Sequence, residues 1–94
     1  MEWQIPVRYG NSLFRLKAEI EYHSNQVMRI RVHGSKSTLL LENNYPLIRL
    51  TSSKKGIHWK IREGVLSGDP VQNSQLLQTI MTFLEKEIKK EFPI

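Results

Sequence analysis

Hydrophobic and polar residues follow two different periods along this chain. Between residues 3 and 63, apolar and polar positions alternate, as they do in strands that bury one face. Between about residues 76 and 92, apolar residues recur every three or four positions, which is the spacing of an amphipathic helix. The change of period predicts an α+β domain in which antiparallel strands precede one C-terminal helix that packs on their apolar face.

Turn-forming residues divide the alternating region into six predicted strands. Because the connections between them contain at most five residues, sequential antiparallel pairing in a meander is the simplest topology. Pro6 has no amide donor, which favours an edge position for the first strand. The predicted strands are residues 3–9, 13–22, 28–33, 38–42, 46–51 and 57–62.

Alternation within these strands predicts which aromatic side chains face the core. The exception is Tyr45, which follows Asn43 and Asn44. Because asparagine tolerates positive φ, we expect a tight hairpin at these two residues, with Tyr45 exposed beside it. The aromatic residues predicted to face the core are Trp3, Tyr9, Phe14, Tyr22 and Trp59 on the strands, together with Phe83 on the apolar side of the helix.

The predicted helix begins near residue 70 and ends near residue 92. Asp69 can cap its first turn and Pro70 suits the first helical position, with Asn73 or Ser74 as alternative caps. A six-stranded sheet is roughly 25 Å wide, whereas one helix is about 10–12 Å across. Two arrangements can cover the remaining apolar surface: the sheet curls around the helix as a half-barrel, or two copies of the chain form a homodimer.

Length and composition predict a single domain spanning residues 1–94. The absence of cysteine suits the cytoplasm, where disulfides are rare. The first residues lack the basic and apolar segments of a signal peptide, and the longest apolar run, Leu39–Leu41, is too short to cross a bilayer. We therefore expect a cytoplasmic protein without a membrane partner.

The positive charge of the chain is concentrated before its C-terminal segment. The formal net charge is +5, and residues 85–91 carry three acids and three bases, so the excess comes from the preceding residues. Such an excess attracts nucleic acid or an acidic protein surface. In the predicted pairing, Arg29 and Arg31 lie opposite glutamates of the neighbouring strands, which is ordinary cross-strand pairing rather than a site.

The hairpin between predicted strands 46–51 and 57–62 is the first candidate site. The pairing places Arg49 opposite His58, and no carboxylate lies in this row. We expect its cations to contact nucleic-acid phosphates, although lysine on an edge strand also protects against aggregation. The predicted contact residues are Arg49, Lys54, Lys55, Lys60 and Arg62, extended by Arg15 and Lys17.

An apolar pair on the polar side of the sheet is the second candidate site. In the predicted register Leu40 lies directly opposite Leu47, with Tyr45 in the adjacent turn. A cluster of apolar side chains among charged ones is typical of a surface that contacts another protein. The alternative function is therefore a protein-interaction or accessory module.

Catalytic and cofactor motifs are missing from the sequence. His23, His33 and His58 have no acidic partner at the spacing of a metal site or catalytic triad, and Asp69 is expected to cap the helix. We therefore expect a non-enzymatic domain without metal or cofactor. The order of strands before a helix resembles that of Pur repeats, which bind nucleic acid, and equally that of pleckstrin-homology-like folds. Order alone does not indicate function.

Overall fold

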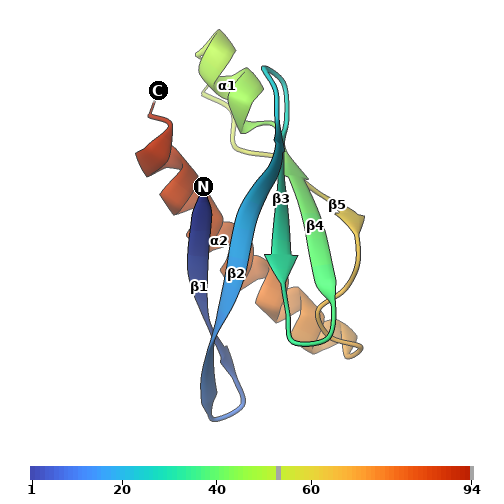
Figure 1. Ribbon diagram of the computed structural model, residues 1–94. Helices are drawn as coiled ribbons and strands as arrows, with labels where there is room; N and C mark the ends of the chain where they lie inside the picture. Colours follow the sequence, from blue (N-terminus) through green and yellow to red (C-terminus); the bar gives the residue numbers. More distant parts are fainter. Residues whose placement is uncertain (53, 94) are drawn as a thin grey trace.

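The structure of the protein, a computed structural model, describes residues 1–52 and 54–93, without the side chain of Tyr9. Five antiparallel strands form one sheet, and a long C-terminal helix lies across one face of it (Figure 1). The α+β class and the C-terminal helix are thereby confirmed. The elements are β1 (Glu2–Tyr9), β2 (Ser12–His23), β3 (Met28–His33), β4 (Thr38–Asn43), α1 (Tyr45–Thr51), β5 (Trp59–Glu63) and α2 (Pro70–Glu91).

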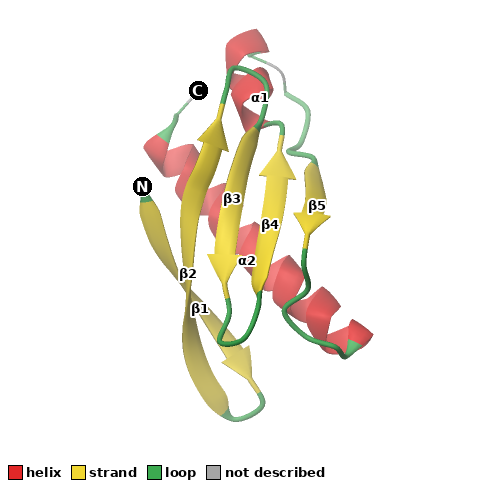
Figure 2. Ribbon diagram, turned by 45° about the vertical axis from the view of Figure 1, so that its right-hand side comes forward, coloured by secondary structure: helices red, strands yellow, loops and turns green. Residues whose placement is uncertain are grey.

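The sheet is an open meander. Its spatial order is β1-β2-β3-β4-β5, and each strand pairs antiparallel with the next one along the chain (Figure 2). β1 and β5 are therefore the two edges, and Pro6 lies in an edge strand as predicted. Because the sheet stays open, the predicted half-barrel is not observed.

The predicted fifth strand, residues 46–51, is instead the helix α1. Pro46 occupies a first-turn position, which suits proline, and Ser52 follows the helix with a left-handed φ of 52°. Tyr45 and Ile48, three residues apart, share the buried side of this helix, whereas Leu50 is exposed. The prediction of a strand at residues 46–51 is therefore wrong. It failed because a segment this short fits the period of a strand and that of a helix almost equally well.

The strand register defines two faces of the sheet, because paired residues on neighbouring strands point to the same side. On the inner face, which α2 covers, Val32 pairs with both Ala18 and Leu39, and all three side chains are fully buried. No second layer formed by residues 1–52 or 54–93 covers the opposite, outer face (Figures 1 and 2). The helix residues buried against the inner face are Leu76, Ile80, Leu84 and Ile88.

The long helix α2 begins where the sequence predicts. The Asp69 carboxylate accepts a hydrogen bond from the backbone N–H of Val71 at 3.1 Å, and Pro70 is the first helical residue. Asn73, the alternative cap, instead accepts hydrogen bonds from two backbone N–H groups of the preceding loop, at 3.1 and 3.2 Å. Local signals therefore suffice to place the start of this helix.

A β-bulge in β2 reverses the side to which its last residues point. Ile20 pairs with Ile30, but Tyr22 pairs with Arg29, so Glu21 is the extra residue. Tyr22 consequently lies on the outer face and is 48% exposed. Its predicted position in the core is wrong, because simple alternation cannot continue through a bulge.

The far end of the β1–β2 hairpin extends beyond the rest of the sheet (Figures 1 and 2). Residues 12–16 of β2 pair only with β1, because the pairing with β3 begins at Lys17. Phe14 pairs with the buried Val7 on the inner side, yet it is 50% exposed, so its predicted burial is wrong. The predicted inward position of Tyr9 lies outside the described side chains.

Candidate nucleic-acid interface

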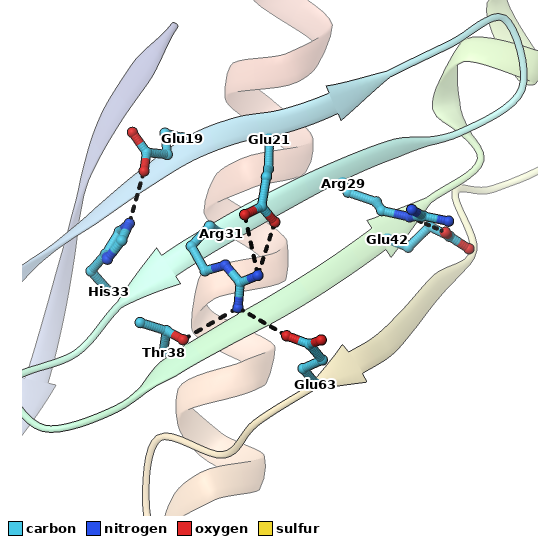
Figure 3. Close-up of polar contacts among 8 residues, drawn as sticks. All are labelled: Glu19, Glu21, Arg29, Arg31, His33, Thr38, Glu42 and Glu63. Atoms are coloured by element: carbon cyan, nitrogen blue, oxygen red, sulfur yellow. Dashed lines mark hydrogen bonds and ion pairs between the residues drawn. The ribbon is translucent and has the colours of Figure 1, made fainter.

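An ion-paired cluster around Arg31 occupies the centre of the outer face (Figure 3). One guanidinium nitrogen of Arg31 lies 3.0 and 3.2 Å from the two carboxylate oxygens of Glu21. The other lies 3.2 Å from a carboxylate oxygen of Glu63 and 3.3 Å from the Thr38 hydroxyl. We call these four residues the central ladder. Because two carboxylates surround one guanidinium, the central ladder does not attract anions.

Glu19 forms a second polar contact beside the central ladder. Its carboxylate lies 2.9 Å from Nε2 of His33 on β3 and 3.9 Å from Nζ of Lys17 on its own strand. The hydrogen bond to His33 and the charge of Lys17 hold the pKa of Glu19 below its ordinary value. The ionised form of Glu19 is therefore favoured, and its negative charge partly neutralises the positive charge of Lys17.

A single cross-strand row joins four strands at the α1 end of the outer face. The register places Tyr22, Arg29, Glu42 and Lys60 side by side on β2, β3, β4 and β5. The Arg29 Cζ atom lies 5.1 Å from the centre of the Tyr22 ring, and its Nε donates to Glu42 at 2.9 Å. We call these four residues the Tyr22 row. It combines an exposed ring with two cations and one carboxylate.

Arg62 adds a third cation to the Tyr22 row. Leu41 pairs with Ile61 and Leu40 pairs with Glu63, so Arg62 is the extra residue of a second bulge. The hydrogen bond from Arg29 lowers the pKa of Glu42, and the charges of Arg62 and Lys60 lower it further. One carboxylate thus faces three cations, and the surplus positive charge lies next to an exposed aromatic ring.

The far end of the β1–β2 hairpin, residues 6–17, is a second basic region on the outer face, and we call it the hairpin end. It contains three cations, Arg8, Arg15 and Lys17, and no acid. Arg15 pairs with Pro6 and Arg8 pairs with Leu13, which is 66% exposed. Within the described part of the chain, Arg8 and Arg15 form no ion pair, so their charge faces solvent.

The structure disperses the five cations that the predicted hairpin brings together. Lys60 and Arg62 lie at the Tyr22 row, whereas Lys54 and Lys55 lie exposed in the connection between α1 and β5. Arg49 lies on α1, with its Cζ atom 5.5 Å from the centre of the Phe92 ring. The predicted hairpin and its carboxylate-free row are wrong, because α1 replaces one strand and Glu42 lies beside Lys60.

Arg49 and His58 are not cross-strand partners either, because Arg49 lies on α1 and His58 precedes β5. The backbone N–H of His58 donates to the side-chain oxygen of Asn44 at 2.8 Å, and this bond ties the α1–β5 connection to the residue before α1. The two predicted extension residues, Arg15 and Lys17, lie at the opposite end of β2 from the Tyr22 row. The predicted site residues therefore form two groups along the outer face rather than one.

The predicted apolar pair does not form. Leu40 lies on the outer face, as predicted, but it pairs with Arg31 and Glu63 and is only 8% exposed. Leu47 lies on α1 and is 40% exposed. Tyr45, predicted to be exposed, is 1% exposed, and its hydroxyl donates to the backbone carbonyl of Phe92. Burial raises the pKa of Tyr45.

The sequence does not predict Tyr22, Arg29 and Arg8 as residues of the candidate site on the outer face. For Arg8 the signal is present in the sequence. Ile5 and Val7 face the core, so alternation along the strand points the side chain of Arg8 outward. For Tyr22 the signal is absent, because the bulge depends on pairing with β3. For Arg29 the sequence predicts only ion pairs with the glutamates opposite it, because alternation places its observed neighbour Tyr22 in the core.

Other kinds of site are weakly represented in the structure. Within residues 1–52 and 54–93, no group of three His, Asp or Glu side chains is placed to hold a metal ion. A shallow groove of about 530 Å³ between Pro6 and α2 is lined mainly by glutamine and threonine. No helix in the described ranges combines the length and apolar character needed to cross a membrane.

Comparisons with known proteins identify no relative. Neither protein-family models, nor curated proteins, nor solved structures match this chain.

Proposed function

We propose that this protein is a small non-enzymatic domain that binds nucleic-acid phosphates with the outer face of its sheet. One observation carries the proposal: cations at both ends of an open face remain available, whereas the glutamates between them are already ion-paired. Arg8 and Arg15 supply this charge at one end, and Lys60 and Arg62 supply it at the other. Basic patches of this kind are the electrostatic footprint of nucleic-acid binding.

Tyr22 supports nucleic acid over other anions. Its ring is 48% exposed and has Arg29 over one side, in the same row as Lys60. A flat aromatic ring among cations can stack on a base or donate its hydroxyl to a phosphate. The bound ligand would be held mainly through its backbone, so binding would be weakly sequence-selective and strongly salt-dependent.

Neutralising one end of the face tests the proposal. In the double variant Lys60→Gln and Arg62→Gln, affinity for a fluorescent DNA or RNA oligonucleotide at 50 mM salt should fall about tenfold. The slope of log affinity against log salt concentration should become shallower by about 1.8 units for duplex DNA or about 1.4 units for a single strand, because each lost contact removes about 0.9 or about 0.7. Fluorescence anisotropy titrations at several salt concentrations measure both quantities.

A matched control separates position from net charge. Lys86→Gln and Lys89→Gln remove the same charge from exposed positions on α2, in the layer behind the sheet. This variant should change the affinity less than twofold. The proposal is wrong if the two variants weaken binding equally, or if the wild-type protein binds neither DNA nor RNA at low ionic strength.

Protein interaction is a second candidate function, favoured by α1. Leu47 and Leu50, three residues apart on this short helix, are 40% and 66% exposed, although their surface differs from the predicted Leu40–Leu47 pair. A partner that uses α1 should survive nuclease treatment in a pull-down and be lost in the Leu47→Ser and Leu50→Ser variant. Homodimer formation also stays a prediction, and light scattering at high concentration measures it.

A further inference from the structure

We infer that the ligand of the outer face is a double helix, contacted at two separate places about one helical turn apart. This inference rests on the proposed function and adds the class of nucleic acid to it. It is carried by the spacing of the two basic ends and by the charge of the surface between them.

The two basic ends are far apart. Arg15 and Tyr22 are seven residues apart on β2, and Lys60 lies three strands away from Tyr22 in the same row. At about 3.4 Å per residue and 4.8 Å per strand, the hairpin end and the Lys60–Arg62 pair are separated by roughly 25–35 Å. This separation fits the longest dimension of the molecule, 41 Å.

The surface between the two ends repels phosphate. In the central ladder, Glu21 and Glu63 surround the single guanidinium of Arg31, and Glu19 lies beside them (Figure 3). A flexible single strand that followed the face from one end to the other would pass directly over these carboxylates. A single strand is therefore disfavoured as a ligand that uses both ends.

A duplex avoids this repulsion because it is stiff. One turn of duplex DNA advances about 34 Å, so phosphates that face the same side recur at nearly the spacing of the two basic ends. The duplex can touch both ends while its groove faces the central ladder. The hairpin end suits such a contact, because it is a two-stranded ribbon projecting beyond the sheet, with Arg8 and Arg15 on one side.

Duplex length provides the decisive measurement. A 20-base-pair duplex reaches both ends, whereas a stem of 6 base pairs, closed by a loop at each end, spans only about 20 Å at 3.4 Å per pair. Both are prepared as DNA and as RNA, since the two share phosphate chemistry, and a 20-nucleotide single strand completes the set. Each oligonucleotide is titrated with four proteins. These are the wild type, the two end variants Lys60→Gln/Arg62→Gln and Arg8→Gln/Arg15→Gln, and the control Lys86→Gln/Lys89→Gln.

Neutralising either end should weaken binding to the long duplex at least tenfold at 50 mM salt and reduce the salt slope by about 1.8 units. On the short stem either end can bind by itself, so losing one should weaken binding only about twofold. The single strand should bind the wild-type protein at least tenfold more weakly than the long duplex.

Three results would overturn the inference. The Arg8→Gln/Arg15→Gln variant could behave like the α2 control on the long duplex, the single strand could bind as tightly as the duplex, or the short stem could show the same losses as the long one. In each case the proposed function survives if Lys60→Gln/Arg62→Gln still weakens binding. Absence of wild-type binding to all the oligonucleotides instead ends both.

Discussion

The two faces of the sheet are built from the same strands but obey different physical constraints. On the inner face, Ile30 and Leu41 pair with each other and are fully buried beneath α2. On the outer face, the residues next to them in sequence, Arg31 and Leu40, also pair with each other, among ionised side chains. The inner face excludes water where α2 covers it, whereas the outer face satisfies its charges locally and remains open.

This difference separates the residues that stabilise the fold from those that can be changed without unfolding it. Burial of apolar surface supplies most of the folding free energy, so the inner face tolerates little change. Exposed ion pairs contribute little to stability, so the charges of the outer face can be altered without unfolding the protein. The outer face is therefore where a ligand can be bound at small cost to the fold.

The largest difference in stability between the two faces is expected when one leucine on each face is shortened to alanine. Leu41→Ala removes a fully buried side chain and should lower the free energy of unfolding by about 3 kcal/mol. Leu13→Ala, on the outer face at 66% exposure, should change it by less than about 0.5 kcal/mol. Urea denaturation followed by circular dichroism measures both, and equal losses would contradict the division between the faces.

A smaller effect is expected at Gly64, which follows β5. Its φ is 86°, and a Cβ atom there would lie 2.1 Å from the backbone carbonyl oxygen of Thr38, so the backbone must move. Gly64→Ala should cost about 2–3 kcal/mol and displace the strand that carries Lys60 and Arg62. Gly10→Ala is the control, because φ is 63° there but the space around it is open.

The Gly10→Ala variant should cost only about 1 kcal/mol, the price of the left-handed backbone alone. Thermal denaturation compares the two glycine variants, and chemical shifts of β5 report whether the strand moves. A Gly64→Ala variant as stable as Gly10→Ala would show that the close approach to Thr38 is not a constraint.

The smallest effect on stability is expected from lowering the pH. It should act through ionised residues of the outer face. The pKa values of Glu19 and Glu42 are held below their ordinary value of 4.5 in the folded protein. Their contribution to stability is therefore present above pH 4.5 and is lost as the pH falls through the lower folded values. At pH 7, Glu19→Gln/Glu42→Gln should be less stable than wild type, and the difference should shrink as the pH falls below 4.5.

Thermal denaturation between pH 7 and pH 3 measures this effect, with Glu2→Gln on the edge strand β1 as the control. The control should follow the wild-type curve at every pH. A stability difference that does not shrink at all between pH 7 and pH 3 would show that Glu19 and Glu42 act through packing rather than through charge.

Much of the fold follows from local sequence patterns. Asp69 and Pro70 specify the start of α2 because capping and proline geometry involve only neighbouring residues. The strands that alternate strictly, such as β3 with Met28, Ile30 and Val32 buried, are placed correctly because apolar residues at every second position fit the period of a strand and not that of a helix.

The remaining features depend on contacts between distant segments. Tyr22 faces outward because the pairing of β2 with β3 skips Glu21, and Phe14 is exposed because the sheet is narrower at that end. The segment from Tyr45 to Thr51 is a helix whose Tyr45 reaches the end of α2. None of these partners is visible within a short window of sequence.

By itself, the sequence determined the α+β class, the meander order, the long helix and the excess of positive charge. These properties depend on periodicity and composition, which are local or summed along the chain. The tertiary structure decided which cations are compensated, since an ion pair such as Arg29–Glu42 depends on strand register. A one-residue bulge turns a side chain to the opposite face, so the charges that meet on the outer face depend on strand register, which local sequence patterns do not contain.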